Sequence, residues 1–202
     1  MINKFLIKWI LLTSALLSVG YITGYIAGLL TGSLFGLTVA HDGTHLAQTV
    51  VYCVFGSVVI TSISITQLSV LKRYNIKISK WWILSGIVGI IISEVIAGVV
   101  LWQLEINRSD LGIFQGGPQL PEALIFSFSG LLIGVFQWLV IRKQFNNSVY
   151  WIPANVLGWG LGHLVMFHLL AFFLGAFVLG SITGLFFYWI IKSNKLIINY
   201  LL

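Results

Sequence analysis

The chain has 202 residues, of which 58% are hydrophobic and only 8% are charged, against roughly 25% charged residues in a typical soluble domain. With a mean hydropathy of +1.01, the composition excludes a soluble globular protein. The net charge of +6 comes from small lysine and arginine clusters at the ends of apolar runs. That pattern orients a protein in a lipid bilayer and differs from the basic stripe of a nucleic-acid-binding protein. We therefore predict a polytopic membrane protein with no nucleic-acid partner.

The first apolar run covers residues 5–40 and holds five glycines at a regular spacing of four. These are Gly20, Gly24, Gly28, Gly32 and Gly36. Residues spaced by four share one face of a helix, and glycine lets a second helix approach that face closely. A helix of this length measures about 54 Å, which exceeds the ~30 Å apolar core of a bilayer. A tilt, an overhang or a break at residues 32–36 is therefore expected.

Five further spans are predicted, at residues 46–71, 81–104 and 122–141, and as two helices within residues 151–191. The last stretch contains no Asp, Glu, Lys or Arg, so we expect two helices of about 18 residues joined by a tight turn near Gly175. With six spans, ten of the eleven basic residues lie on one side of the membrane. The positive-inside rule then places both termini in the cytoplasm.

One motif occurs in two related copies, and its clearer copy consists of Gln137, Trp138, Arg142 and Trp151. In the copy 70 residues upstream, Gln67 stands for Gln137 and Trp81 stands for Trp151 without a gap. Tryptophan rings and basic side chains are typical of the headgroup region. Each copy therefore marks one helix that ends at the cytoplasmic interface and another that starts there.

Glycine pairs indicate a third copy near the C-terminus. Gly180 and Gly184 lie 50 residues after Gly130 and Gly134, although Phe187 stands where the motif has its glutamine. Small residues at these positions favour close packing of the returning helices. The copies together predict an all-α fold with six transmembrane helices arranged as three parallel hairpin repeats. The hairpins cover about residues 5–71, 81–141 and 151–191 of a single integral membrane domain, residues 1–202.

Glycine-rich hairpins that end in Gln-Trp-Leu-Val-Ile-Arg, followed by a loop and a new tryptophan, resemble a family of small uncharacterised bacterial membrane proteins common in cyanobacteria. The matching residues are Gly134, residues 137–142, Trp151, Asn155 and residues 158–162. The resemblance implies a multi-pass protein of a bacterial inner or thylakoid membrane. It implies no catalytic activity.

A histidine pair after the first span offers one candidate metal site. His41 and His45 are four residues apart and enclose Asp42, a spacing that suits metal ligands on one helical turn. A solvated loop near the lipid headgroups accounts for the same residues, and we favour that interpretation. No cofactor is expected.

Glu94 and His163 are ionisable residues predicted to lie deep in the bilayer. Glu94 follows Trp81 by 13 residues and His163 follows Trp151 by 12, which places both about 18–20 Å from the cytoplasmic interface. Ionisable groups at that depth are costly and usually face the protein interior. Two interpretations stay open: a hydrogen-bonded pair that fixes helix register, and a proton or ion site.

Two classes of function are compatible with these features. The first expectation is a membrane scaffold or accessory protein without catalytic activity, which associates with itself or with other membrane proteins through glycine faces. The alternative is a small proton- or ion-coupled transporter or channel that uses Glu94 and His163. An enzyme ranks third because the chain has so few polar clusters.

Overall fold

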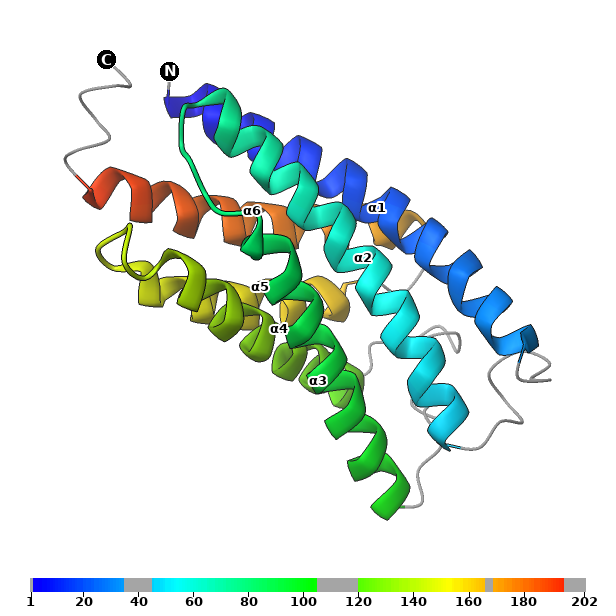
Figure 1. Ribbon diagram of the computed structural model, residues 1–202. Coiled ribbons are helices and arrows are strands. Elements are labelled where there is room, and N and C mark those ends of the chain that lie inside the picture. The colour runs from blue at the N-terminus through cyan, green and yellow to red at the C-terminus, as the bar shows by residue number, and fades with distance from the viewer. Residues whose placement is uncertain (1, 35–44, 105–119, 166–168, 195–202) are drawn as a thin grey trace.

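The computed structural model describes residues 2–34, 45–104, 120–165 and 169–194. Within these ranges the chain forms six α-helices, one short 3-10 helix and no strand (Figure 1). The α-helices are α1 (Ile2–Leu34), α2 (His45–Arg73), α3 (Trp81–Gln103), α4 (Leu120–Ile141), α5 (Trp151–Leu164) and α6 (Leu169–Ser193). The 3-10 helix η3 (Ser148–Tyr150) leads into α5. The predicted all-α class is confirmed.

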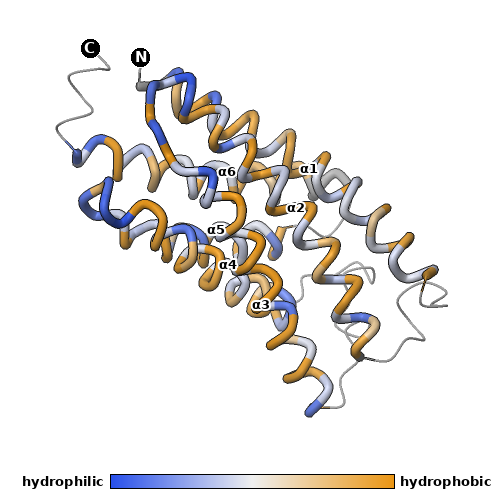
Figure 2. Tube along the Cα trace, viewed as in Figure 1, coloured by the Kyte–Doolittle hydropathy of each residue, from blue (hydrophilic) through white to orange (hydrophobic). Residues whose placement is uncertain are grey.

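Five of the helices, all except α5, are long and apolar enough to cross a bilayer. Figure 2 shows apolar residues along most of each helix, with hydrophilic residues concentrated toward the end where α1 begins. Since a bilayer offers no hydrogen-bond partners, a helix is the natural way for such apolar segments to satisfy their own backbone groups. The fold fits the predicted multi-pass integral membrane protein.

The predicted division of residues 151–191 is wrong in its boundary. Helix α5 ends at Leu164 and has 14 residues, about 21 Å, whereas α6 has 25 residues and contains Gly175 well inside it. Gly175 allows close packing instead of a turn: a Cβ added at Gly162 would lie 3.1 Å from the Gly175 carbonyl oxygen. The two helices therefore need small residues at this crossing.

Helix α1 continues without a break through Gly32 to Leu34, so a break at that glycine does not occur, and Gly36 lies outside the described residues. Three of the spaced glycines face α2. A Cβ added at Gly20 would lie 3.1 Å from the Ser62 Cβ, and one at Gly24 would lie 3.0 Å from the Phe55 carbonyl oxygen. This glycine face is therefore covered by the chain's own second helix.

The later glycine pairs also pack within the chain. A Cβ at Gly134 would lie 3.0 Å from the Ile152 Cα of α5, and one at Gly180 would lie 3.2 Å from the Ile10 carbonyl oxygen of α1. Gly130 and Gly184 face the same two helices. Helix α4 thus packs closely against α5, and helix α6 packs closely against α1.

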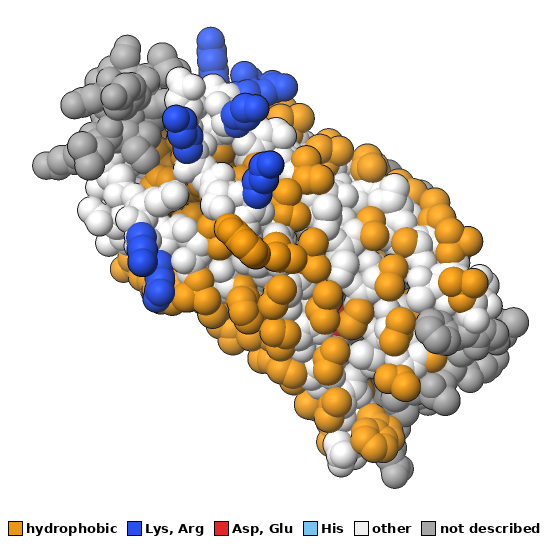
Figure 3. All heavy atoms as spheres, viewed as in Figure 1, with side chains coloured by type: hydrophobic (Ala, Val, Ile, Leu, Met, Phe, Trp, Pro, Cys, Tyr) orange, Lys and Arg blue, Asp and Glu red, His pale blue; other side chains and the backbone are white. Residues whose placement is uncertain are grey.

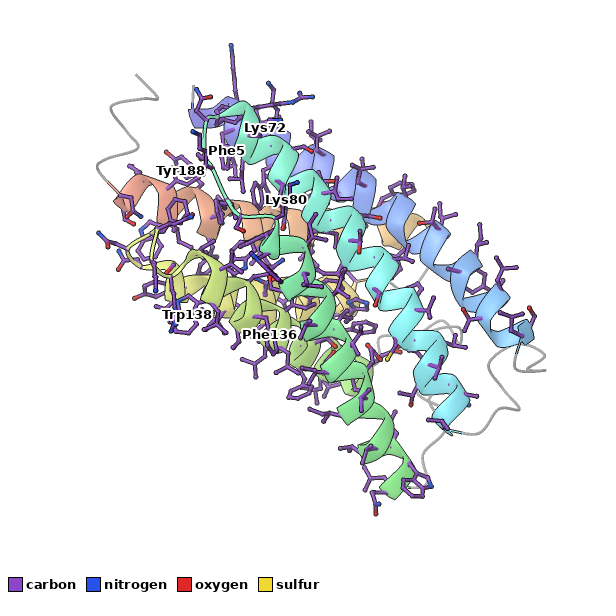
Figure 4. The ribbon with its side chains drawn as sticks, viewed as in Figure 1. Phe5, Lys72, Lys80, Phe136, Trp138 and Tyr188 are labelled. Atoms are coloured by element: carbon purple, nitrogen blue, oxygen red, sulfur yellow. The ribbon has the colours of Figure 1, made fainter. Side chains whose placement is uncertain are left out.

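The helices form a closed ring. Each helix packs against its two neighbours in chain order, and α6 returns to pack against α1. The start of α1 and the ends of α2, α4 and α6 share one end of the bundle (Figure 1). On the face shown in Figure 3, the lysine and arginine side chains gather at this end, which we call the basic end. In Figure 4, Phe5 and Lys72 mark it.

Candidate functional site

Three tryptophans at the basic end each join two helices by a hydrogen bond. Trp82 Nε1 donates to Gln67 Oε1 at 3.1 Å, which joins α3 to α2. Trp151 Nε1 donates to Gln137 Oε1 at 3.0 Å, which joins α5 to α4. Trp9 Nε1 donates to Thr183 Oγ1 at 3.4 Å, which joins α1 to α6 and completes the ring.

The position of Trp81 corrects the gapless alignment of the two motif copies. Trp81 is 65% exposed, whereas its neighbour Trp82 is fully buried and makes the bond that Trp151 makes in the next copy. A shift of one residue turns a helical side chain by about 100°, so only one tryptophan of the pair can face the interior. The interval from the motif glutamine to the buried tryptophan is therefore 15 residues in this copy and 14 residues in the next.

Phe187, which stands where the motif has its glutamine, packs against all three of these tryptophans. Its ring stacks on Trp9 with centroids 5.0 Å apart and contacts Trp82 and Trp151 at 6.2 and 5.2 Å. Thr183, one helical turn earlier, accepts the indole hydrogen bond instead. The three tryptophans and Phe187 are part of one buried aromatic cluster.

The remaining motif residues lie outside this cluster. The Arg142 guanidinium lies over the Trp138 ring, 5.6 Å from its centroid, and its head is exposed. This arrangement is a cation–π contact of the kind that anchors a helix end near lipid headgroups.

The buried tryptophans also set a register for the interior of the ring. The residue twelve positions after each of them is polar or ionisable: Tyr21 after Trp9, Glu94 after Trp82 and His163 after Trp151. The helices that carry these tryptophans, α1, α3 and α5, start at the basic end and run in the same direction (Figure 1). The three residues therefore occupy matched positions about 18 Å from the tryptophans.

His163 bonds to Tyr21 across the ring. Its Nε2 lies 2.7 Å from the Tyr21 hydroxyl, and its Nδ1 lies 2.9 Å from the Trp159 carbonyl oxygen. Since a carbonyl oxygen only accepts, Nδ1 carries a proton. In the neutral imidazole Nε2 is then the acceptor, and the Tyr21 hydroxyl donates to it. The Phe126 ring stacks on the imidazole with centroids 3.3 Å apart.

Two buried carboxyl groups complete the site. Glu94 is 2% exposed and Glu122 is 6% exposed, and both interact electrostatically with Tyr21. Glu122 lies in the first turn of α4, one turn before Phe126, and His163 lies in the last turn of α5. We call Tyr21, Glu94, Glu122 and His163 the polar cluster. It lies toward the end of the bundle opposite the basic end.

Sequence reasoning found two members of the polar cluster and missed two. Tyr21 follows Trp9 by the same interval that relates Glu94 to Trp82, but this signal is visible only when Trp82 replaces Trp81 in the alignment. Glu122 is the first residue of the span predicted at residues 122–141 and was not singled out there. No sequence signal distinguishes it from an interfacial glutamate.

An apolar layer separates the polar cluster from the tryptophans. Leu17, Ile90 and Trp159 lie eight residues after Trp9, Trp82 and Trp151 respectively. All three are buried and belong to a second core cluster with residues of α2, α4 and α6. The polar cluster is therefore closed toward the basic end by tightly packed side chains.

The predicted outer metal site is not described. His41 and Asp42 lie outside the described residues, and the side chain of His45 is likewise not described. Among the residues that the structure describes, no group of three or more His, Cys, Asp or Glu side chains could hold a metal ion.

No protein-family model, characterised protein or solved structure matches the chain. The resemblance to small cyanobacterial membrane proteins stays a prediction.

Proposed function

We propose that the chain is a small proton-conducting membrane protein and that the polar cluster is its proton site. The observation that carries the proposal is the Tyr21–His163 hydrogen bond, flanked by the buried carboxyl groups of Glu94 and Glu122. Ionisable side chains in a membrane interior are costly and commonly mark proton or ion pathways. One hydrogen-bonded pair of side chains would be enough to fix the register of two helices. The polar cluster instead brings together four ionisable side chains from four helices.

The proposal includes a pseudo-threefold arrangement of three parallel hairpins. It is supported by the three tryptophan hydrogen bonds and by the matched positions of Tyr21, Glu94 and His163. The positive-inside rule then assigns the basic end to the cytoplasm. All nine described lysines and arginines are exposed, as this orientation requires.

The scaffold function has less support from the geometry. It relied on glycine faces free to receive a partner, but seven of the nine glycines considered, at positions 20, 24, 28, 130, 134, 180 and 184, face other helices of this chain. Co-purification from native membranes tests it: a stoichiometric protein partner, together with no proton flux, would favour the scaffold.

Proton flux and stability in two Glu94 variants test the proposal. Purified protein is reconstituted into liposomes, and the collapse of an imposed pH gradient is followed with an enclosed dye. We expect Glu94→Gln to lower the flux at least tenfold and to keep the wild-type melting temperature in detergent, because the amide keeps the shape but does not titrate. Glu94→Leu should lower both, because it removes the polar partner from a buried polar site.

Two outcomes would contradict the proposal. If Glu94→Gln conducts protons like the wild type and only Glu94→Leu is unstable, the cluster is a register lock. If the wild type does not collapse the gradient faster than empty liposomes, the protein does not conduct protons.

A further inference from the structure

We infer that Tyr21 is the bridge that carries a proton between the carboxyl groups and His163. The inference rests on the proposed proton site and adds the route inside it. It starts from the position of the Tyr21 hydroxyl, which lies 2.7 Å from His163 Nε2 and interacts electrostatically with Glu94 and Glu122. Tyr21 thus combines a hydrogen bond to His163 with electrostatic interactions with both carboxyl groups.

The tautomer of His163 sets the direction of the Tyr21 hydroxyl. Because Nδ1–H donates to the Trp159 carbonyl oxygen, only Nε2 can receive a further proton. Its lone pair already points at the Tyr21 hydroxyl. The Tyr21 hydroxyl is therefore positioned to deliver a proton to this imidazole.

The transfer balances without any co-reactant. A protonated carboxyl group donates its proton to the Tyr21 oxygen while the phenol proton passes to His163 Nε2. The O–H bond of the acid and the O–H bond of the phenol break, and a new O–H and a new N–H bond form. Tyr21 begins and ends as a neutral phenol, the acid becomes a carboxylate, and His163 becomes an imidazolium.

The surroundings of His163 suit the charged product. An imidazolium would lie against the Phe126 ring at a centroid distance of 3.3 Å, and a cation over an aromatic face is stabilised by the ring quadrupole. The new carboxylate belongs to a residue that interacts electrostatically with Tyr21, and its negative charge offsets that of the imidazolium. The described part of α6 that packs beside α5 adds no ionisable group between residues 173 and 187.

The position of Glu122 sets the direction in which we expect protons to move. Glu122 is in the first turn of α4, at the end opposite the basic end, whereas Leu17, Ile90 and Trp159 close the other side. The expected order is therefore entry at a carboxyl group, transfer through Tyr21, and arrival at His163.

Trp159 provides a direct readout of this last step. Its ring lies nearly parallel to the imidazole, at a centroid distance of 5.9 Å and an angle of 17°. An imidazolium so close to an indole quenches its fluorescence. Subtracting the signal of His163→Gln protein removes the contribution of the other tryptophans.

The experiment is a rapid drop in pH on detergent-solubilised protein, followed by tryptophan fluorescence. Tyr21→Phe keeps the ring that packs against Phe55, at a centroid distance of 5.3 Å, and removes only the hydroxyl. We expect it to slow the His163-dependent quench at least tenfold. Tyr25→Phe is the matched control, because it removes the same group one turn later from an exposed side chain and should leave the rate unchanged.

Two results would overturn the inference: a wild-type quench rate in Tyr21→Phe, or no His163-dependent quench in the wild-type protein. The measurement needs no membrane and no proton flux. If the quench slows in Tyr21→Phe but the wild-type protein conducts no protons in liposomes, only the proposed function is refuted. If the wild-type protein conducts protons but Tyr21→Phe quenches at the wild-type rate, only the role of Tyr21 as the bridge is refuted.

Discussion

The indole nitrogen of Trp82 donates to the side-chain oxygen of Gln67 at 3.1 Å, in the interior at the basic end. Trp82→Phe should keep most of the aromatic packing and leave the Gln67 oxygen without this donor. Because a buried acceptor that loses its partner costs about 1–3 kcal/mol, we expect a lower melting temperature in detergent.

Trp81→Phe is the control for that variant. Trp81 is largely exposed, so its replacement should change the melting temperature little. A greater loss of stability in Trp81→Phe than in Trp82→Phe would restore the gapless alignment and contradict the assigned register.

Two glycines should respond differently to the same added methyl group. A Cβ at Gly89 would lie 2.8 Å from the backbone nitrogen and Cα of Ile133, which cannot move aside. At Gly28 the nearest atom is a side-chain carbon of Val51 at 3.3 Å. We expect Gly89→Ala to destabilise the protein by about 1–3 kcal/mol and Gly28→Ala to be neutral or stabilising. Thermal unfolding in detergent measures both, and equal effects would argue against the close crossing of α3 and α4.

The apolar layer should act as a barrier to protons. Ile90 is buried in this layer, and the adjacent Ile91 is exposed toward lipid. Ile90→Ala opens space beside the polar cluster and should raise the proton leak of liposomes about tenfold, at a cost of about 2–5 kcal/mol in stability. Ile91→Ala should leave the leak unchanged. A folded Ile90→Ala protein with wild-type flux would show that this layer does not limit conduction.

Asn194 fastens the end of α6 to the loop between α4 and η3. Its Oδ1 accepts from the Asn146 backbone nitrogen at 2.8 Å, and its Nδ2 donates to the carbonyl oxygens of Asn146 and Ile190 at 3.2 and 2.7 Å. Asn194→Ala should cost about 1–3 kcal/mol in unfolding experiments. Asn146→Ala should be nearly neutral because only the Asn146 backbone takes part in these bonds.

Labelling of single cysteines tests the orientation, in a protein that carries Cys53→Ala. Lys77 and Gln144 are exposed at the basic end, and Gln103 is exposed at the opposite end of α3. A membrane-impermeant thiol reagent added to whole cells should modify cysteine at 103 and leave cysteine at 77 and 144 unmodified. Modification at 77 or 144 would reverse the proposed topology.

The sequence alone determined the membrane class and most helix positions. Apolar runs of about 20 residues have few stable alternatives in a bilayer, because an unpaired backbone group there costs several kcal/mol. Composition is therefore enough to predict where α2, α3 and α4 lie to within a few residues. The same reasoning found Glu94 and His163, because an ionisable residue inside an apolar run is conspicuous in any sequence.

Tertiary structure decided helix register, and with it the site. Periodicity could not choose between Trp81 and Trp82, since the choice depends on which ring meets Gln67 across a helix crossing. Residues 151–191 are apolar throughout, so hydropathy gave no boundary between α5 and α6. In sequence, Tyr21 is one aromatic residue within a long apolar run, and Glu122 resembles an ordinary interfacial residue at a helix start. Tyr21 is buried against Phe55 of α2 and His163 of α5, and no local pattern encodes contacts between residues so far apart in the chain.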